Sequence, residues 1–210
     1  MMSFEEILRI LDDIHDLSNS EEKRVFLEIR EIANTDNKGF IRSVRNLPLS
    51  DDKHKPNHMN LLNLSWLYEI LAPDIAHWES FYVEEIDRLT AEAERSVLPG
   101  TILEPIDSYI FVADFSNDHQ KDIFIQHFAR YLNSNIPQIR FKHIGFIGDF
   151  LTDRDSNGFK RIEEVSLTDT DWRVRYICHD VLTHLGGSDK TKIRALDSLR
   201  GKLFSGYKYD

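Results

Sequence analysis

The second half of the sequence repeats itself at an interval of 35 residues. The five residues Phe111–Phe115 are matched by Phe146–Phe150, and Val181–Leu185 occupies the same five positions of a third copy. Pro137–Phe141 aligns with Trp172–Tyr176 in the same register. Internal repetition at roughly 30 to 47 residues, combined with a helical spacing of apolar side chains, is typical of stacked helix pairs. We therefore expect helices that bury their apolar faces against neighbouring pairs.

Most of the chain carries apolar residues at the three- and four-residue spacing of a helix. We predict helices over residues 3–17, 18–34, 39–47, 61–71, 73–97, 105–115, 118–133, 136–151, 157–167, 171–186 and 189–204. The first two begin with capping boxes, in which Ser3 is paired with Glu6 and Ser18 with Glu21. Two prolines among polar residues predict an exposed loop over residues 48–57.

The predicted fold class is all-α, because the chain lacks alternating apolar runs joined by hairpin turns. The repeat favours a right-handed α-α superhelix of antiparallel helix pairs, with about 10–11 helices. We expect this superhelix to form a single domain over residues 1–210. Within it, residues 1–104 form a divergent acidic part, and residues 105–204 carry the repeats.

Residues Asp171–Tyr176 resemble the start of the second helix of a HEAT repeat. That family places an acidic residue at the helix cap, then a Val-Arg pair, here Val174 and Arg175, and then apolar positions that face the core. Residues 135–150 resemble a second and looser copy of the same helix. The resemblance covers about half of the chain and implies a HEAT-like α-solenoid. Independently of the family, Asp171 is placed to cap a helix, and Arg175 to pair with acidic residues of an adjacent unit.

The net charge of −10 is confined to the first half of the chain. Residues 1–105 contain 11 Lys and Arg against 21 Asp and Glu, whereas residues 106–210 contain 15 of each. A surface of this sign repels nucleic acid and attracts a basic protein. The alternative is a solvated helix face without a partner. If a partner binds, the candidate contact residues are Glu79, Glu84, Glu85, Asp87, Glu92 and Glu94.

The segment Asp153–Glu164 matches the spacing of an EF-hand calcium loop, with an oxygen-bearing residue at each ligand position and Gly158 at the turn. The resemblance implies these ligands: Asp153, Asp155, Asn157, the backbone carbonyl of Phe159, and Glu164. The alternative is a turn between repeats, because Asp, Ser, Asn and Gly are also the common residues of turns. If calcium binds, we expect it to brace the solenoid rather than to take part in catalysis.

Several features favour a protein that is neither an enzyme nor a membrane protein. The sequence has no phosphate-binding glycine loop and no motif of a catalytic nucleophile or a zinc site. Cys178 is the only cysteine, and the longest apolar runs are only a few residues, which favours a cytoplasmic location. Trp66, Trp78 and Trp172 fit apolar stripes and are expected in the core more than at an interface.

The sequence therefore predicts a non-enzymatic protein-protein interaction module that needs no cofactor. A dedicated inhibitor of the immunity-protein type, which binds a basic toxin through an acidic helical face, is one form of it. A first alternative is a calcium-binding structural or sensor protein that uses residues 153–164. A remote alternative is a HEAT-like DNA glycosylase, which the acidic net charge disfavours.

Overall fold

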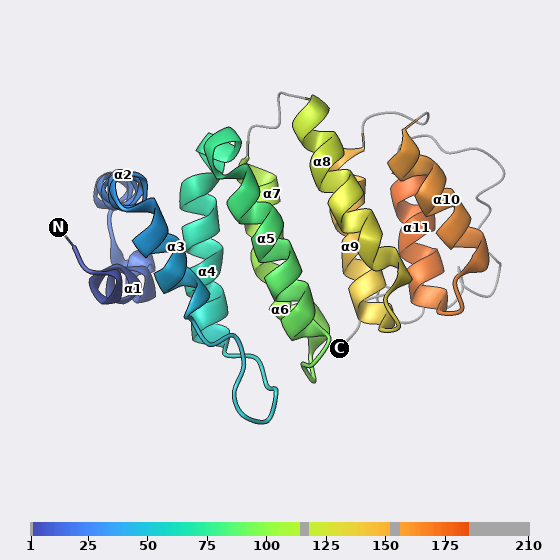
Figure 1. Cartoon of the computed structure of the whole chain (residues 1–210), viewed down its shortest axis with the longest axis horizontal. Helices are drawn as coiled ribbons and strands as arrows, with labels where there is room; N and C mark the ends of the chain where they lie inside the picture. The colour runs from blue at the N-terminus through green and yellow to red at the C-terminus, as the bar shows by residue number, and fades with distance from the viewer. Residues whose placement is uncertain (1, 114–117, 152–155, 185–210) are drawn as a thin grey trace. The chain divides into compact units, whose positions relative to one another are not determined.

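The computed structural model describes residues 2–113, 118–151 and 156–184 (Figure 1). The predicted last helix, residues 189–204, lies outside these ranges. The described residues confirm an all-α fold, because they contain helices and no strand. An isolated antiparallel bridge between Ser50 and Pro56 closes the loop predicted at residues 48–57.

The contacts within the chain divide it into two compact units. The first unit comprises Met1–Val97 and Thr101–Asp114, and the second comprises Leu98–Gly100 and Phe115–Asp210. The helices of the first unit are α1 (Phe4–Asp12), α2 (Asn19–Thr35), α3 (Asn37–Arg45), α4 (His58–Leu71), α5 (Ile75–Ala93) and α7 (Glu104–Val112). Those of the second are α8 (Asp118–Ala129), α9 (Pro137–Phe150), α10 (Asn157–Thr168) and α11 (Trp172–His184). Shorter segments are α6 (Pro99–Ile102), η1 (Ile14–Asp16), η2 (Ala72–Asp74) and η3 (Arg130–Asn133).

Both predicted capping boxes are present at the starts of α1 and α2. The backbone N–H of Ser3 donates to the Glu6 carboxylate at 2.6 Å, and the backbone N–H of Glu6 donates to the Ser3 hydroxyl at 3.2 Å. Ser18 and Glu21 form the equivalent box. These hydrogen bonds hold the pKa of Glu6 and of Glu21 below the usual range of a glutamate. Local sequence alone therefore determines where the first two long helices begin.

Helix α4 occupies the middle of the first unit, where it contacts α1, α2, α7 and η2. Three buried tyrosines, Tyr68, Tyr82 and Tyr109, gather beside it. The hydroxyl of Tyr82 donates to the carbonyl oxygen of Tyr68 at 2.6 Å, and the Tyr82 ring lies 4.4 Å from the Tyr109 ring, measured between centroids. Burial raises the pKa of all three phenols well above the usual value. The core of this unit is therefore aromatic and uncharged, apart from the carboxylate of Glu85 described below.

The second unit consists of two helix pairs, α8 with α9 and α10 with α11. Helix α9 also contacts α11, and α8 contacts α10, so the two pairs lie side by side in two layers (Figure 1). Glycine permits the close approach in each layer. A Cβ atom on Gly148 of α9 would lie 2.7 Å from Cγ2 of Val181 in α11, and one on Gly158 of α10 would lie 2.8 Å from Cγ2 of Ile125 in α8.

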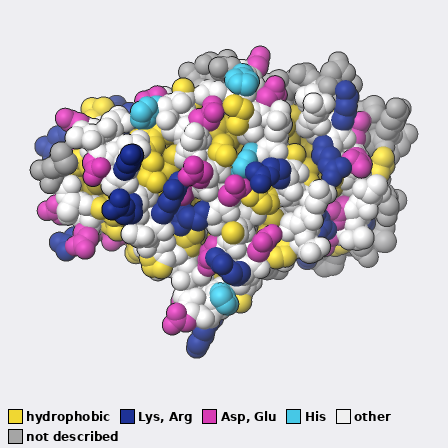
Figure 2. Space-filling view, viewed as in Figure 1, with side chains coloured by type: hydrophobic (Ala, Val, Ile, Leu, Met, Phe, Trp, Pro, Cys, Tyr) yellow, Lys and Arg dark blue, Asp and Glu magenta, His cyan; other side chains and the backbone are white. Residues whose placement is uncertain are grey.

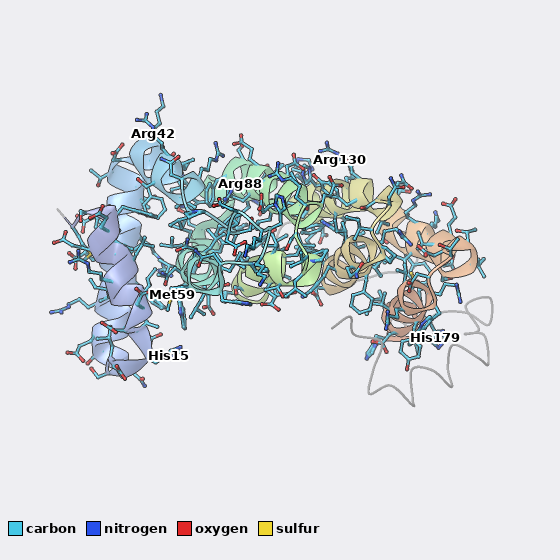
Figure 3. All side chains as sticks on the ribbon, turned by 90° about the horizontal axis from the view of Figure 1, so that it is seen from below. His15, Arg42, Met59, Arg88, Arg130 and His179 are labelled. Carbon is cyan, nitrogen blue, oxygen red and sulfur yellow. The ribbon has the colours of Figure 1, made fainter. Side chains whose placement is uncertain are left out.

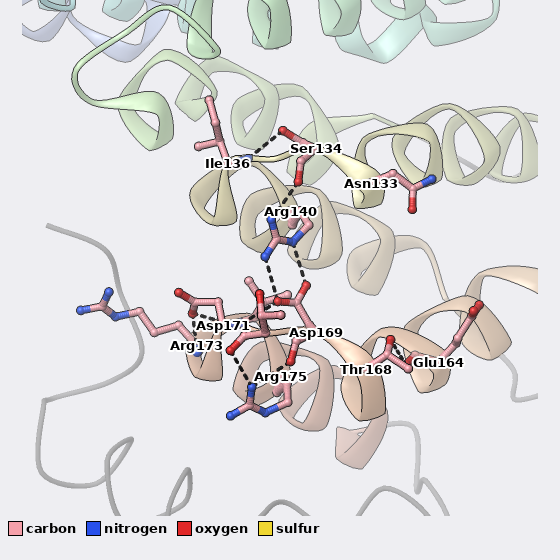
Figure 4. A network of polar contacts seen from close by, with 12 residues as sticks. Asn133, Ser134, Ile136, Arg140, Glu164, Thr168, Asp169, Asp171, Arg173 and Arg175 are labelled. Atoms are coloured by element: carbon pink, nitrogen blue, oxygen red, sulfur yellow. Dashed lines mark hydrogen bonds and ion pairs between the residues drawn. The ribbon is translucent and has the colours of Figure 1, made fainter.

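An arginine links the two pairs of the second unit (Figure 4). The Nε and Nη2 atoms of Arg140 donate to the two carboxylate oxygens of Asp169, at 2.7 and 2.8 Å. Its Nη1 donates to the carbonyl oxygen of Ser134 at 2.8 Å. Arg175 repeats this last contact 35 residues later in the sequence, because its Nη1 donates to the carbonyl oxygen of Asp169 at 2.8 Å. The sequence period of 35 residues therefore corresponds to a repeated hydrogen bond.

Asp171 caps α11 as expected, because its Oδ1 accepts from the backbone N–H of Arg173 at 2.8 Å. Arg140 forms an ion pair with Asp169 that joins the two helix pairs of the second unit, and the pairing expected of Arg175 with an acidic residue stays a prediction. The described partners of Arg175 include the carbonyl oxygens of Asp169 and Thr170.

We expect Arg140→Met to lower the free energy of unfolding by about 3–5 kcal/mol, because it leaves the buried Asp169 carboxylate without its cation. Urea unfolding followed by circular dichroism measures this change. Lys160→Met is the control, since Lys160 is exposed on α10, and it should change stability by less than about 0.5 kcal/mol. Equal effects of the two substitutions would show that the arginine contact is not a stabilising one.

His143 is fully buried on α9, among the rings of Phe128, Tyr131 and Phe146. Burial, with a smaller contribution from His127, lowers the pKa of His143 from 6.5 to about 3. Between these two values the unfolded chain binds a proton at this site and the folded chain does not. The free energy of unfolding should therefore fall by up to about 1.4 kcal/mol per pH unit as the pH drops below 6.5.

Urea unfolding of the wild type and of His143→Phe, at a series of pH values between 7 and 4, tests this dependence. The variant should lose this part of the slope. Substituting the exposed His58 with Phe is the matched control. Identical slopes in wild type and His143→Phe would contradict a buried, neutral histidine.

Candidate protein-interaction surface

Helix α5 and its C-terminal cap, Glu94, present the acidic residues that the sequence singles out as partner contacts. Its buried side carries apolar residues such as Trp78, Tyr82 and Ile86. Among the six candidate residues, Glu84 and Glu94 are exposed, and Glu79, Asp87 and Glu92 are partly exposed. Glu85 is the exception, because only 1% of it is exposed and it points into the first unit. The structure therefore places five of the six at the surface and assigns Glu85 to the interior.

Glu85 joins three helices of the first unit through a buried network. The hydroxyl of Tyr68 on α4 donates to Oε2 of Glu85 at 2.6 Å. Arg88 donates to the same oxygen from Nε at 2.9 Å and from Nη2 at 2.6 Å, and Nε of Arg45 on α3 lies 3.4 Å from Oε1. Because three donors converge on it, Glu85 fixes α3, α4 and α5 together and is not available to a partner.

Arginines also neutralise acidic residues on the exposed side of α5. Arg45 forms an ion pair with Glu84, and Nη2 of Arg95 lies 2.6 Å from Oε2 of Glu92. On the face seen in Figure 2, Lys and Arg side chains accordingly lie beside Asp and Glu side chains. The α5 side of the first unit is therefore less acidic than the composition of the helix alone indicates.

A groove of about 460 Å³ lies between the end of α3 and α5. It is lined by residues 45–50 and by Arg88, Glu92 and Arg95. The hydroxyl of Ser50 donates to Oε1 of Glu92 in this groove. Since each of the three guanidinium groups is already paired with a carboxylate, the groove carries little net charge. The hydrogen bond between Ser50 and Glu92 ties the chain segment after α3 to α5. The groove offers no unpaired cation to an anionic ligand.

The loop that follows the groove is exposed, as the sequence predicts, and is fastened to the end of α5. The backbone N–H of Asp51 donates to the carbonyl oxygen of Lys55 at 2.9 Å, and that of Asn57 donates to Leu49 at 2.8 Å. Val97 then donates to the carbonyl oxygen of His54 at 3.1 Å. His54 adopts a φ of 58°, the left-handed conformation that such a tight loop requires.

The opposite side of the first unit exposes apolar side chains. In Figure 3, His15 and Met59 lie on the side away from Arg42 and Arg88. Met59 is 52% exposed and Leu62 is 44% exposed, although both are apolar residues of α4. The partly exposed Trp66 follows them at the spacing of one helix face. Its ring lies 5.6 Å from His15 and 6.3 Å from Phe26, measured between centroids.

Two carboxylates border this apolar surface. Burial raises the pKa of Glu69, and the nearby charge of Glu22 raises it further. Neither carboxylate has an ion pair within the described part of the chain. We call this surface the α2–α4 face, and it consists of His15, Glu22, Phe26, Met59, Leu62, Trp66 and Glu69. The sequence did not reveal it, because α4 carries apolar residues on all sides and every one of them fits a buried helix.

The three tryptophans differ in their surroundings. Trp78 is 2% exposed in the core, as expected, whereas Trp66 and Trp172 are only partly buried. The guanidinium carbon of Arg173 lies 5.4 Å from the centroid of the Trp172 ring. Cys178 is buried as expected, and burial raises the pKa of its thiol well above the usual value, which keeps the thiol protonated.

The segment that matches a calcium loop lies at the start of α10. Asp153 and Asp155 are outside the described residues. Asn157 is the first residue of α10, and the N–H of Phe159 donates to the Ser156 hydroxyl that caps the helix. Glu164, two turns further, forms an ion pair with Arg161. Residues 157–164 are thus helical, and no group of three potential metal ligands is found within the described ranges. Calcium binding here stays a prediction.

Comparison with protein-family models, with curated proteins and with solved structures gave no match to this chain. None of the helices in the described ranges has the length and apolar character needed to cross a bilayer.

Glu85 and its neighbour Glu84 provide a direct test of the buried network. We expect Glu85→Ala to lower the free energy of unfolding by about 3–5 kcal/mol, because Arg88 and the Tyr68 hydroxyl lose a buried acceptor. Glu84→Ala should cost at most about 1 kcal/mol, because the Glu84 side chain is 60% exposed. Urea unfolding of both variants measures the difference, and similar losses would contradict the assignment of Glu85 to the interior.

Proposed function

We propose that this chain is a non-enzymatic protein-binding module, built as a short α-solenoid, whose acidic first unit attracts a basic protein. The single observation that carries the proposal is the excess of acidic residues in the first half of the chain. Five of the six candidate contact residues, on α5 and at its end, reach the surface. A charge excess of this size accelerates the encounter with a basic partner over distances of about a Debye length.

The second unit supports the solenoid part of this proposal. Its two helix pairs lie side by side, and the arginine contact recurs with the sequence period. Repeat proteins of this kind expose long surfaces, because each unit buries only the faces that contact its neighbours. Such surfaces are commonly used to bind other proteins, and they do not require a cofactor.

A dedicated inhibitor is the form of this function that the charge favours most. An immunity protein for a basic toxin is one example, because the toxin must be bound quickly and its cationic surface covered. Opposite charges on the two partners supply that speed, and buried contacts supply the lifetime of the complex.

Capture of binding proteins from a lysate of the source cells, at low salt and with elution by a salt step, tests the proposal first. We expect a basic protein to be released by salt. Surface plasmon resonance with that protein then measures the association rate of the Glu84→Lys, Asp87→Lys, Glu94→Lys triple variant. The rate should fall by about tenfold or more at low salt, and the dissociation rate should change little.

The control is the triple variant Asp122→Lys, Glu163→Lys, Glu164→Lys, which changes the net charge equally but lies in the second unit. It should slow association much less. Equal association rates for wild type and the α5 variant, or a captured partner that is itself acidic, would contradict the proposed role of the acidic first unit.

A further inference from the structure

We propose that the α2–α4 face is the docking site for an amphipathic, lysine- or arginine-bearing helix of the partner protein. This inference rests on the proposed function and deepens it, because it names the contact surface and the chemistry of the segment that binds there. Attraction by the acidic first unit and docking on this face are separate steps. They affect the association rate and the dissociation rate, respectively.

The shape of the face suits a helix. Met59, Leu62 and Trp66 follow one another at intervals of three and four residues along α4 and form one apolar stripe. His15 and Phe26 flank the Trp66 ring from η1 and α2. A partner helix that lays its own apolar stripe along such a row buries side chains at the same intervals. Trp66 supplies the large aromatic surface that is typical of interface anchors.

The charge of the face selects the partner. Glu22 precedes Phe26 by one turn of α2, Glu69 follows Trp66 by about one turn of α4, and α2 packs against α4, which brings the two carboxylates to the same face. No ion pair joins either of them to a cation within the described ranges. A lysine or arginine placed between the two carboxylates would relieve their mutual repulsion while the apolar residues are covered. The pair therefore favours a basic helix over a neutral or acidic one.

The same charge argues against two other occupants. In a symmetric dimer of this chain, the same patch of both copies meets, which brings Glu22 and Glu69 of one copy near those of the other. An anionic lipid surface would also be repelled by these carboxylates and by the acidic first unit as a whole. A basic protein segment is the occupant for which both the apolar stripe and the charge are favourable.

The probe is a synthetic amphipathic helical peptide of leucine and lysine that carries a fluorescent label. A peptide of the same composition in scrambled order is its control. Fluorescence anisotropy with the full chain should show binding of the amphipathic peptide and binding at least about tenfold weaker of the scrambled one. Leu62→Asp and Met59→Asp should each weaken binding about tenfold or more.

Leu167→Asp is the matched control variant, because Leu167 is 57% exposed but belongs to α10 of the second unit. It should bind the amphipathic peptide as the wild type does. The double variant Glu22→Gln, Glu69→Gln should weaken binding at low salt and have little effect at high salt. Circular dichroism of each variant checks that the fold is retained, which substitutions at these exposed and partly exposed positions should allow.

Four results would overturn the inference. One is equal binding of the two peptides, and another is an unchanged affinity of Leu62→Asp. The third is a wild-type dimer in sedimentation equilibrium that Leu62→Asp dissociates, which would assign the face to a second copy. Absence of peptide binding would likewise reject this face, while the capture experiment with the α5 variant would still decide the proposed function independently.

Discussion

The first unit depends on one buried carboxylate. Glu85 lies inside an otherwise uncharged and aromatic core, where an ion without partners would be strongly destabilising. Tyr68, Arg88 and Arg45 together compensate it, and they come from three different helices. Because α3, α4 and α5 must all be in place for this compensation, the network couples the positions of these three helices.

The overall helical character of the chain could be predicted from the spacing of its apolar residues, and the starts of α1 and α2 from their capping boxes. The 35-residue period also predicted a structural repeat, which Arg140 and Arg175 make through equivalent hydrogen bonds. These features are local, or they recur at a fixed interval, and both kinds of signal survive in a single sequence. The short helix α6 was not predicted, because Pro99 and Gly100 resemble a simple helix end.

The surface chemistry could be predicted only in part. Glu84, Glu85 and Glu92 look alike in sequence, but residues distant in the chain contact each of them differently, and only Glu85 accepts the hydroxyl of the buried Tyr68. Arg45 reaches Glu84 from α3, and Ser50 reaches Glu92 from the loop. The α2–α4 face escaped prediction for a related reason: a helix that is apolar on all sides does not reveal which side its neighbours leave uncovered. Only the packing of α1, α2 and α7 around α4 settles that question.

The arginine contact of the second unit has a direction along the chain. Arg140 donates to the carbonyl oxygen of Ser134, which precedes it in the chain, and to the carboxylate of Asp169, which follows it. The carbonyl oxygen of Asp169 in turn accepts from Arg175. The pair α10–α11 thus supplies the acceptor Asp169, and the pair α8–α9 before it supplies Arg140. A duplicated segment of 35 residues inserted in register would find both partners already present. Growth of the chain by duplication of whole 35-residue repeats is therefore compatible with this arrangement, whereas insertion of a partial repeat would separate Arg140 from Asp169.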